Sequence, residues 1–267
     1  KDREGEYKVL ERISFQRSFD SILSICMNVS DNYKNMAVEF LYDREIDCLF
    51  NDILSSFHDC IQINLLQLIH FMFKNVKLIP TNQSFEAILN DCSPPLKLPR
   101  IDYTCFITII NQYEEYLDNY DILILSLKIL YCEISLNHYD ERFFQYMHEK
   151  KLIRVIHILI NDSPHNLKIN TISFVSKLLP YMPIYILEEL LELEIPSTLI
   201  DYLDIGEHSI TSTSLKCLAS FVNLMNKYGI PIDLIAETYQ THRDEFDIPE
   251  SAKDDLVNLE IALSLNN

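Results

Sequence analysis

Apolar residues recur along the chain at a helical spacing and with a long period of 43 residues. Ile172 lies in the apolar segment 170–181; a step of 43 residues forward reaches Leu215, and the same step back reaches Ile129. A step of 63 residues separates Ile129 from Leu66, and one more step of 43 reaches Leu23. A fixed period of about 20–50 residues indicates a repeat protein, so each of these residues predicts a long helix in one repeat.

A second series of apolar residues runs 20 positions ahead of the first. Each member is followed by apolar residues four and eight positions later, and residues four apart share one face of a helix. The members are Ile46, Ile109, Leu152 and Ile195. Two series with one period and a fixed offset predict a second, middle helix in each repeat.

Shorter apolar stretches precede the second series, at residues 36–42, 85–89, 143–147 and 184–191. No strand is expected, because alternating β-branched runs are short and hairpin turns of the Asn-Gly or Asp-Gly type are absent. We therefore predict one all-α domain over residues 1–267, a right-handed solenoid of about four three-helix repeats with partial terminal repeats. The tail from Pro231 is either a partial last repeat or a cap.

An insertion of about 20 residues interrupts the period, and we place it at residues 78–100. This stretch holds four prolines, which break helices and stiffen loops: Pro80, Pro94, Pro95 and Pro99. Insertions in solenoids usually fall on one face. The insertion is either part of a binding face or a passive surface loop.

The three-helix unit of 43 residues resembles an armadillo-type repeat, whose period is about 40–47 residues. The closest local match is residues 191–203, which read LELEIPSTLIDYL. Glu194 stands where the armadillo family usually has glycine, and the corresponding turns hold Lys151 and Glu45. The resemblance implies that the long helices line a concave groove. It does not extend to the importin-α adaptors, because Asn137 and Asn223 lack the tryptophan neighbours of that family and the chain has no Trp.

The candidate binding residues lie one, four, five and eight positions after the core residue of each long helix. This face is mostly polar and of mixed charge, so it could hold an extended peptide through amide and charged contacts. Alternatively, it is only the solvated side of amphipathic helices. The residues are Gln67, His70, Lys74, Glu133, Asn137, Ser173, Lys177, Lys216 and Asn223.

Charge is strongly negative and unevenly distributed. The chain has 22 Lys and Arg against 40 Asp and Glu, a formal net charge of −18, which is a poor match for nucleic acid. Residues 183–267 hold 16 acidic and 4 basic residues, a net charge of −12. This last third either attracts a basic peptide or partner domain, or simply keeps the protein soluble.

No motif indicates catalysis, a metal site or a cofactor. The 3 Gly cannot build a phosphate-binding loop, and no two of the 7 Cys stand at CxxC spacing. Scattered thiols suit a cytoplasmic or nuclear protein, and no apolar run is long enough to span a membrane. The chain begins at Lys1 rather than Met, so we expect a fragment of a longer protein.

The sequence thus predicts a non-catalytic scaffold or adaptor that binds a protein segment on the groove of an armadillo-like solenoid. The alternative is a structural or regulatory domain of a larger cytoskeletal or trafficking assembly. Such a domain would pack against other chains through its convex face or its ends.

Overall fold

The computed structural model describes residues 63, 65–71, 103–116, 118–136, 141–246 and 248–264, together with Ser18, Ser21 and Ser24. The chain divides into two compact units, residues 1–109 and residues 110–267, and we describe each by itself. The single domain over residues 1–267 stays a prediction.

The first unit is described mainly through one helical segment, residues 65–71. Leu66 is fully buried there, as its place in the first apolar series predicts, while Gln67 is exposed. Helix α6 (Tyr103–Asn111) begins in the same unit. Leu23, Glu45, Ile46 and the insertion at residues 78–100 lie outside the described residues.

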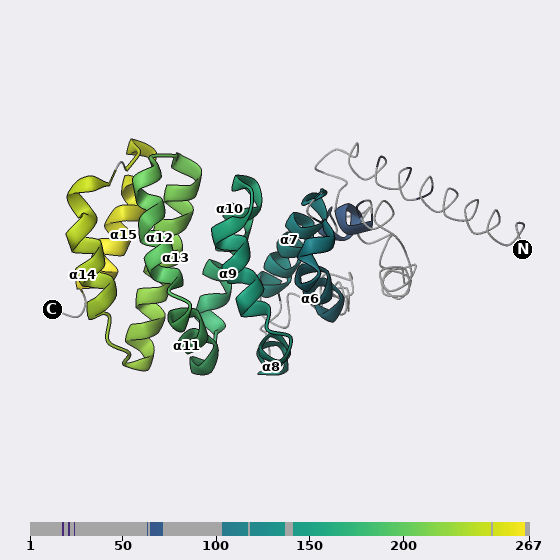
Figure 1. The fold of residues 1–267 in the computed structure, drawn as a ribbon, viewed down its shortest axis with the longest axis horizontal. Coiled ribbons are helices and arrows are strands. Elements are labelled where there is room, and N and C mark those ends of the chain that lie inside the picture. Colours follow the sequence, from purple (N-terminus) through teal and green to yellow (C-terminus); the bar gives the residue numbers. More distant parts are fainter. Residues whose placement is uncertain are drawn as a thin grey trace, which may run out of the picture. The chain divides into compact units, whose positions relative to one another are not determined.

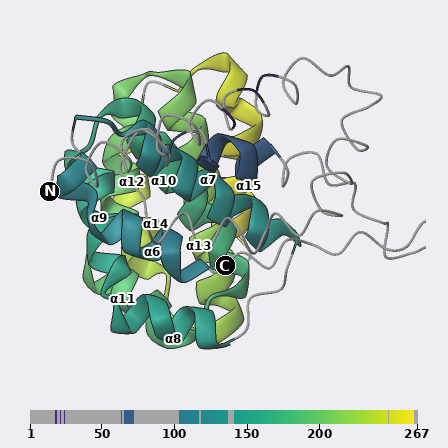
Figure 2. The same ribbon diagram turned by 90° about the vertical axis from the view of Figure 1, so that its right-hand side faces the viewer.

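The second unit contains two complete triplets of a short, a middle and a long helix (Figure 1). The first is α8 (Glu141–Glu149), α9 (Leu152–Asp162) and α10 (His165–Leu178). The second is α11 (Ile184–Glu192), α12 (Ile195–Asp201) and α13 (His208–Tyr228). The short helices α8 and α11 lie at the same edge of this unit in both views (Figure 1 and Figure 2).

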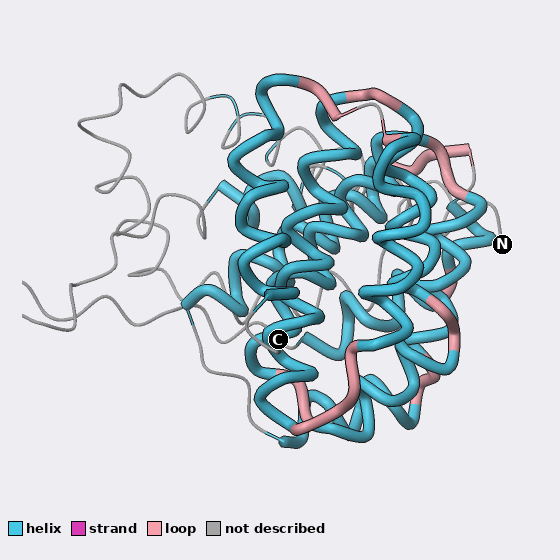
Figure 3. The backbone as a smooth tube through the Cα atoms, turned by 90° about the vertical axis from the view of Figure 1, so that its left-hand side faces the viewer, coloured by secondary structure: helices cyan, strands magenta, loops and turns pink. Residues whose placement is uncertain are grey.

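The second unit also contains helices before, between, within and after these triplets. They are η2 (Tyr113–Tyr116), α7 (Asp121–Leu136), η3 (Leu179–Tyr181), η4 (Tyr202–Ile205), α14 (Asp233–His242), η5 (Arg243–Glu245), η6 (Glu250–Ala252) and α15 (Lys253–Ser264). The described part of the chain holds no strand (Figure 3), so the all-α prediction is confirmed. None of the described helices is long and apolar enough to cross a membrane.

The long helices form a row in which α10 packs between α7 and α13, and α13 packs against α15. Ile129, Ile172 and Leu215 are fully buried in successive members of this row. Leu152 and Ile195, from the second series, are fully buried at the starts of α9 and α12. Each repeat thus buries its apolar stripe by stacking on its neighbours, which confirms the solenoid.

Hydrogen bonds between repeats follow the same period. Ser212 Oγ donates to Asp255 Oδ2 at 2.6 Å across 43 residues, and Ser251 Oγ lies 2.8 Å from His208 Nδ1 across the same separation. The hydroxyl of Tyr202 donates to the backbone oxygen of Ile160 at 2.6 Å, 42 residues earlier. The period read from apolar residues is therefore also the period of the polar contacts.

One predicted helix is wrong. The second series places a middle helix from Ile109 onward, but α6 ends at Asn111 and is followed by the short 3-10 helix η2. Tyr113, the next residue of the expected apolar stripe, lies in η2, and Leu117 lies outside the described residues. Asn111 instead donates from Nδ2 to the backbone oxygen of Lys150 at 3.0 Å.

Helix α15 is the last described helix of the row. The period places Asn258 where Ile172 and Leu215 lie in the earlier long helices, and Asn258 is exposed. Leu259 and Ala262 are buried in its place, so α15 presents a different face to α13.

Candidate functional site

A polar stripe follows the exposed side of α10 and α13. The residues recur every three or four positions, so on each helix they lie on one face, opposite the buried Ile172 and Leu215. We call this surface the ladder face. Its members are Asn166, Asn170, Ser173 and Lys177 on α10, and Ser209, Thr213, Lys216, Ser220, Asn223 and Lys227 on α13.

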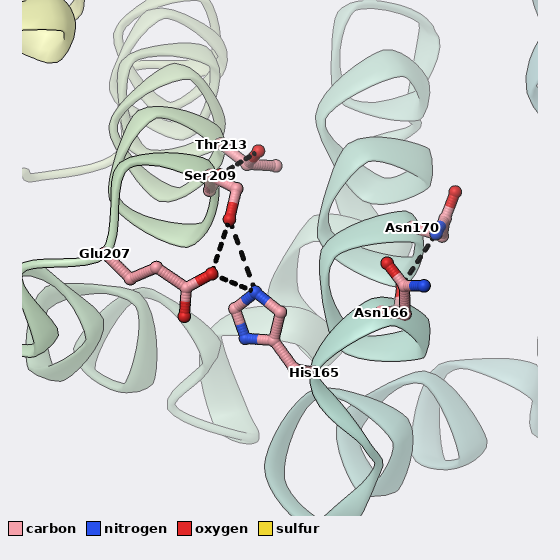
Figure 4. Close-up of polar contacts among 6 residues, drawn as sticks. All are labelled: His165, Asn166, Asn170, Glu207, Ser209 and Thr213. Carbon is pink, nitrogen blue, oxygen red and sulfur yellow. Dashed lines mark hydrogen bonds and ion pairs between the residues drawn. The ribbon is translucent and has the colours of Figure 1, made fainter.

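Several polar side chains of the ladder face donate to their own helices. Asn170 Nδ2 donates to the backbone oxygen of Asn166 at 2.6 Å, and Thr213 Oγ1 to that of Ser209 at 2.7 Å (Figure 4). Ser220 Oγ does the same toward Lys216 at 2.9 Å. A hydroxyl whose proton is used in this way keeps its oxygen as an acceptor. These side chains can therefore accept hydrogen bonds from the backbone N–H groups of a bound segment.

At the N-terminal end of the ladder face, a histidine joins the two helices. His165 Nε2 lies 2.7 Å from Glu207 Oε1 and 3.3 Å from Ser209 Oγ (Figure 4). A Ser-His-carboxylate relay needs the hydroxyl and the carboxylate on opposite nitrogens of the ring. Both oxygens approach the same nitrogen here, so the cluster is an inter-repeat contact and has no relay geometry.

The charge of the ladder face differs from that of the whole chain. Neither α10 nor α13 contains Asp or Glu, and their ladder residues include three lysines. Lys216 Nζ lies 3.3 Å from Asp255 Oδ2 of α15, and Lys177 Nζ lies 5.3 Å from the centre of the Tyr131 ring of α7. The face is therefore neutral to basic on a strongly acidic protein.

The structure brings four of the predicted binding residues together: Ser173 and Lys177 on α10, and Lys216 and Asn223 on α13. In the first unit, Gln67 is exposed and His70 is half-buried. Glu133 lies in α7, but its side chain is outside the described part, and Lys74 and Asn137 are wholly outside it.

Sequence reasoning missed the N-terminal half of the stripe, Asn166, Asn170, Ser209 and Thr213. These residues lie two and six positions before the core residue of each helix, whereas only later positions were considered. Continuing the spacing of three and four residues backward along each helix would have found them.

The described residues offer no metal centre, since no three of their His, Cys, Asp or Glu side chains gather to hold an ion. Cys105, Cys132 and Cys217 form no disulfide bond. Burial raises the pKa of the Cys217 thiol, so this cysteine is an inert part of the core.

The stacked triplets and the row of long helices define an armadillo-type solenoid. A designed armadillo repeat protein is similar in structure, with a TM-score of 0.57 at 12% identity, over 93% of this chain and 92% of that chain. Computationally designed armadillo repeat proteins for modular peptide recognition give a TM-score of 0.56 at 12% identity, over 92% of each chain.

A third similar structure is a designed armadillo repeat protein in complex with the peptide (KR)4. Its TM-score is 0.53 at 9% identity, over 92% of this chain and 98% of that chain. No protein-family model matches the chain, and the comparison with curated proteins gives no significant match. The fold is thus established as armadillo-type by structure alone.

Proposed function

We propose that this protein is a non-catalytic scaffold or adaptor that binds an extended protein segment along the ladder face. The observation that carries the proposal is the continuous stripe of amides, hydroxyls and lysines across two adjacent long helices. By the armadillo resemblance, these helices line the concave side of the solenoid.

An extended segment has backbone N–H and C=O groups without partners, and losing their hydrogen bonds to water costs free energy. The ladder face offers groups of both kinds. Asn223 is exposed with an amide that can donate and accept, and Thr213 and Ser220 present hydroxyl oxygens. Such a face is better suited to binding an extended peptide backbone than to binding the surface of a globular protein.

The similar solved structures support the proposal, but it does not rest on them. Two of the similar structures are described by their peptide recognition or their bound peptide. Identities of 9% and 12% speak for the fold alone, so the peptide binding of those proteins comes to this chain as a proposal. As part of this proposal we place the protein in the cytoplasm or nucleus, because none of the described cysteines forms a disulfide bond.

The test is affinity capture from native cell lysate with mass spectrometry. We would compare the wild type with a ladder variant, Asn170→Ala/Asn223→Ala, and with a control variant on α11, Glu188→Ala/Glu192→Ala. The wild type and both variants should unfold at the same temperature, because the changed side chains lie at the surface. A specific partner lost only by the ladder variant supports the proposal, and a partner that both variants retain contradicts it.

A second candidate function rests on the exposed apolar side chains of α15. Val257 is 50% exposed and Ile261 is 54% exposed, one turn apart on the side of α15 opposite Leu259. This end would pack on another chain if the protein were a structural or regulatory domain of a cytoskeletal or trafficking assembly. In the same capture experiment, a Val257→Ser/Ile261→Ser variant would then lose the partner that the ladder variant keeps.

A further inference from the structure

The acidic residues of this protein avoid the two helices that carry the ladder face. Residues 183–267 hold 16 Asp and Glu, yet the 21 residues of α13 contain none. The exposed carboxylates lie instead on the other helices, for example Glu192 on α11, Asp201 on α12 and Glu237 on α14. A chain that is acidic elsewhere thus has one face whose own helices carry no carboxylate, although Glu207 and Asp255 lie beside it.

The protein already holds one carboxylate beside this face. Asp255 Oδ2 accepts a hydrogen bond from Ser212 Oγ at 2.6 Å and lies 3.3 Å from Lys216 Nζ. Ser212 and Lys216 stand four residues apart on α13, so both point to the same place. The side chain of Asp255 is only 15% exposed. Ser212 and Lys216 together therefore hold one carboxylate of the protein itself.

A Ser–Lys pair of the same spacing occurs on α10, one turn further along the helix, since Ser173 stands 43 residues before Lys216. Ser173 and Lys177 stand four residues apart, with Ser173 half-buried and Lys177 exposed. Among the described side chains, which do not include that of Glu133 on α7, no carboxylate lies within ion-pair distance of Lys177, whose ammonium rests over the Tyr131 ring. On α13, Asn223 and Lys227 repeat the spacing, both exposed.

We propose that the ladder face takes an acidic segment, with Asp or Glu carboxylates of the partner seated at Ser173–Lys177 and Asn223–Lys227. This rests on the proposed function and replaces, for this face, the basic partner that the overall charge suggests. The carboxylates on the other helices repel such a segment elsewhere and so direct it to the ladder face.

A purely structural role for these lysines must be separated from this one. Lys177 and Lys227 lie in the last turns of their helices, where a cation interacts favourably with the helix dipole. That role affects the stability of the helix but not the charge of a bound peptide. The test therefore reads binding as well as unfolding.

The experiment selects binders from a display library of random peptides on the intact protein and measures their affinities by fluorescence anisotropy. We expect peptides rich in Asp and Glu, with binding that weakens at high salt. Lys177→Gln and Lys227→Gln should each weaken their binding by about two- to fivefold. Lys253→Gln, a control on the exposed side of α15, should leave it unchanged.

The outcomes distinguish this inference from the proposed function. Selected peptides that are basic overturn the inference, as do acidic peptides that bind the two lysine variants as well as the wild type. If the basic peptides nevertheless lose binding to the Asn170→Ala/Asn223→Ala variant, the ladder face is still the binding site. A selection that yields no peptide counts against both the proposed function and the inference.

Discussion

Lys151 and Glu194 lie 43 residues apart and adopt the same left-handed backbone conformation. Lys151 has φ 55° and ψ 31°, and Glu194 has φ 54° and ψ 27°. Each residue precedes a middle helix, α9 or α12, at the turn where the armadillo family usually has glycine. The two turns thus have the same left-handed geometry, although this conformation is unfavourable for both Lys and Glu.

Glycine at these turns should stabilise the protein. A left-handed conformation costs an L-residue about 1–2 kcal/mol, part of which glycine loses again through its greater entropy in the unfolded chain. We expect Lys151→Gly and Glu194→Gly each to raise the free energy of unfolding by about 0.5–1 kcal/mol, measured by urea denaturation.

Alanine at the same position is the matched control, because it removes the side chain but keeps the strain of its Cβ atom. Glu194→Ala should therefore leave the free energy of unfolding within about 0.5 kcal/mol of the wild type. Equal effects of glycine and alanine would show that the side chain, and not the backbone conformation, limits stability at this turn.

The sequence predicted those parts of the fold that depend on periodic burial. Ile172 and Leu215 could be placed in the core because each repeat must cover its apolar stripe with the next. The break after Asn111 was not predicted, because the apolar spacing continues from Ile109 to Tyr113. Ser173 and Lys177 could be assigned to one face from helical spacing.

The contacts of the candidate site between repeats could not be predicted. Asp255 meets Lys216 where α13 packs against α15. The spacing of apolar residues does not encode which polar side chains of two neighbouring helices meet. The sequence already shows that α10 and α13 contain no Asp or Glu. The relevance of this to binding became clear only from the position of the Asp255 carboxylate in the structure.

A buried hydrogen bond between repeats should contribute measurably to stability. The Tyr202 hydroxyl donates to the Ile160 backbone oxygen at 2.6 Å, in a site from which water is largely excluded. Tyr202→Phe leaves that oxygen without a partner, so we expect a loss of about 1–2 kcal/mol in urea denaturation.

Tyr228 provides the comparison for this measurement. Its hydroxyl donates to the Met182 backbone oxygen at 2.9 Å, but the residue is 36% exposed, so water can replace the lost hydroxyl. Tyr228→Phe should cost clearly less than Tyr202→Phe. A larger loss of stability for Tyr228→Phe would mean that burial does not determine how much these hydrogen bonds contribute to the free energy of unfolding.

Alkaline pH should weaken the C-terminal end of the solenoid through Tyr239. Burial, followed by the neighbouring Glu260 carboxylate, raises the pKa of Tyr239 to about 12 from an ordinary value of 10.0. Above pH 10.0 the unfolded chain releases this proton while the folded chain retains it, so stability falls as pH rises toward about 12.

Tyr239→Phe lacks this proton, so its free energy of unfolding should fall less steeply over the same pH range. The quantity to measure is the difference in unfolding free energy between wild type and variant, followed by urea denaturation from neutral pH upward. A difference that stays constant above pH 10.0 would contradict the raised pKa.

The ion pair between Lys216 and Asp255 links helix α15 to the ladder face. Asp255→Asn keeps a hydrogen-bond acceptor for Ser212 but removes the charge opposite Lys216. Lys216 is then available to a partner's carboxylate, so acidic peptides selected on the wild type should bind about two- to fivefold more tightly. The variant should meanwhile lose up to about 1 kcal/mol of stability, since one ion pair is gone.

These two effects have a common origin, and a double-mutant cycle can show it. If Asp255 competes with the partner for Lys216, the affinity gained through Asp255→Asn must vanish in the Asp255→Asn/Lys216→Gln protein. A gain that persists without Lys216 would point to a general decrease in negative charge near the face. Helix α15 would then influence the partner only through its electrostatic field. The contact of Asp255 with Ser212 and Lys216 would then give no information on how the ladder face binds an acidic segment.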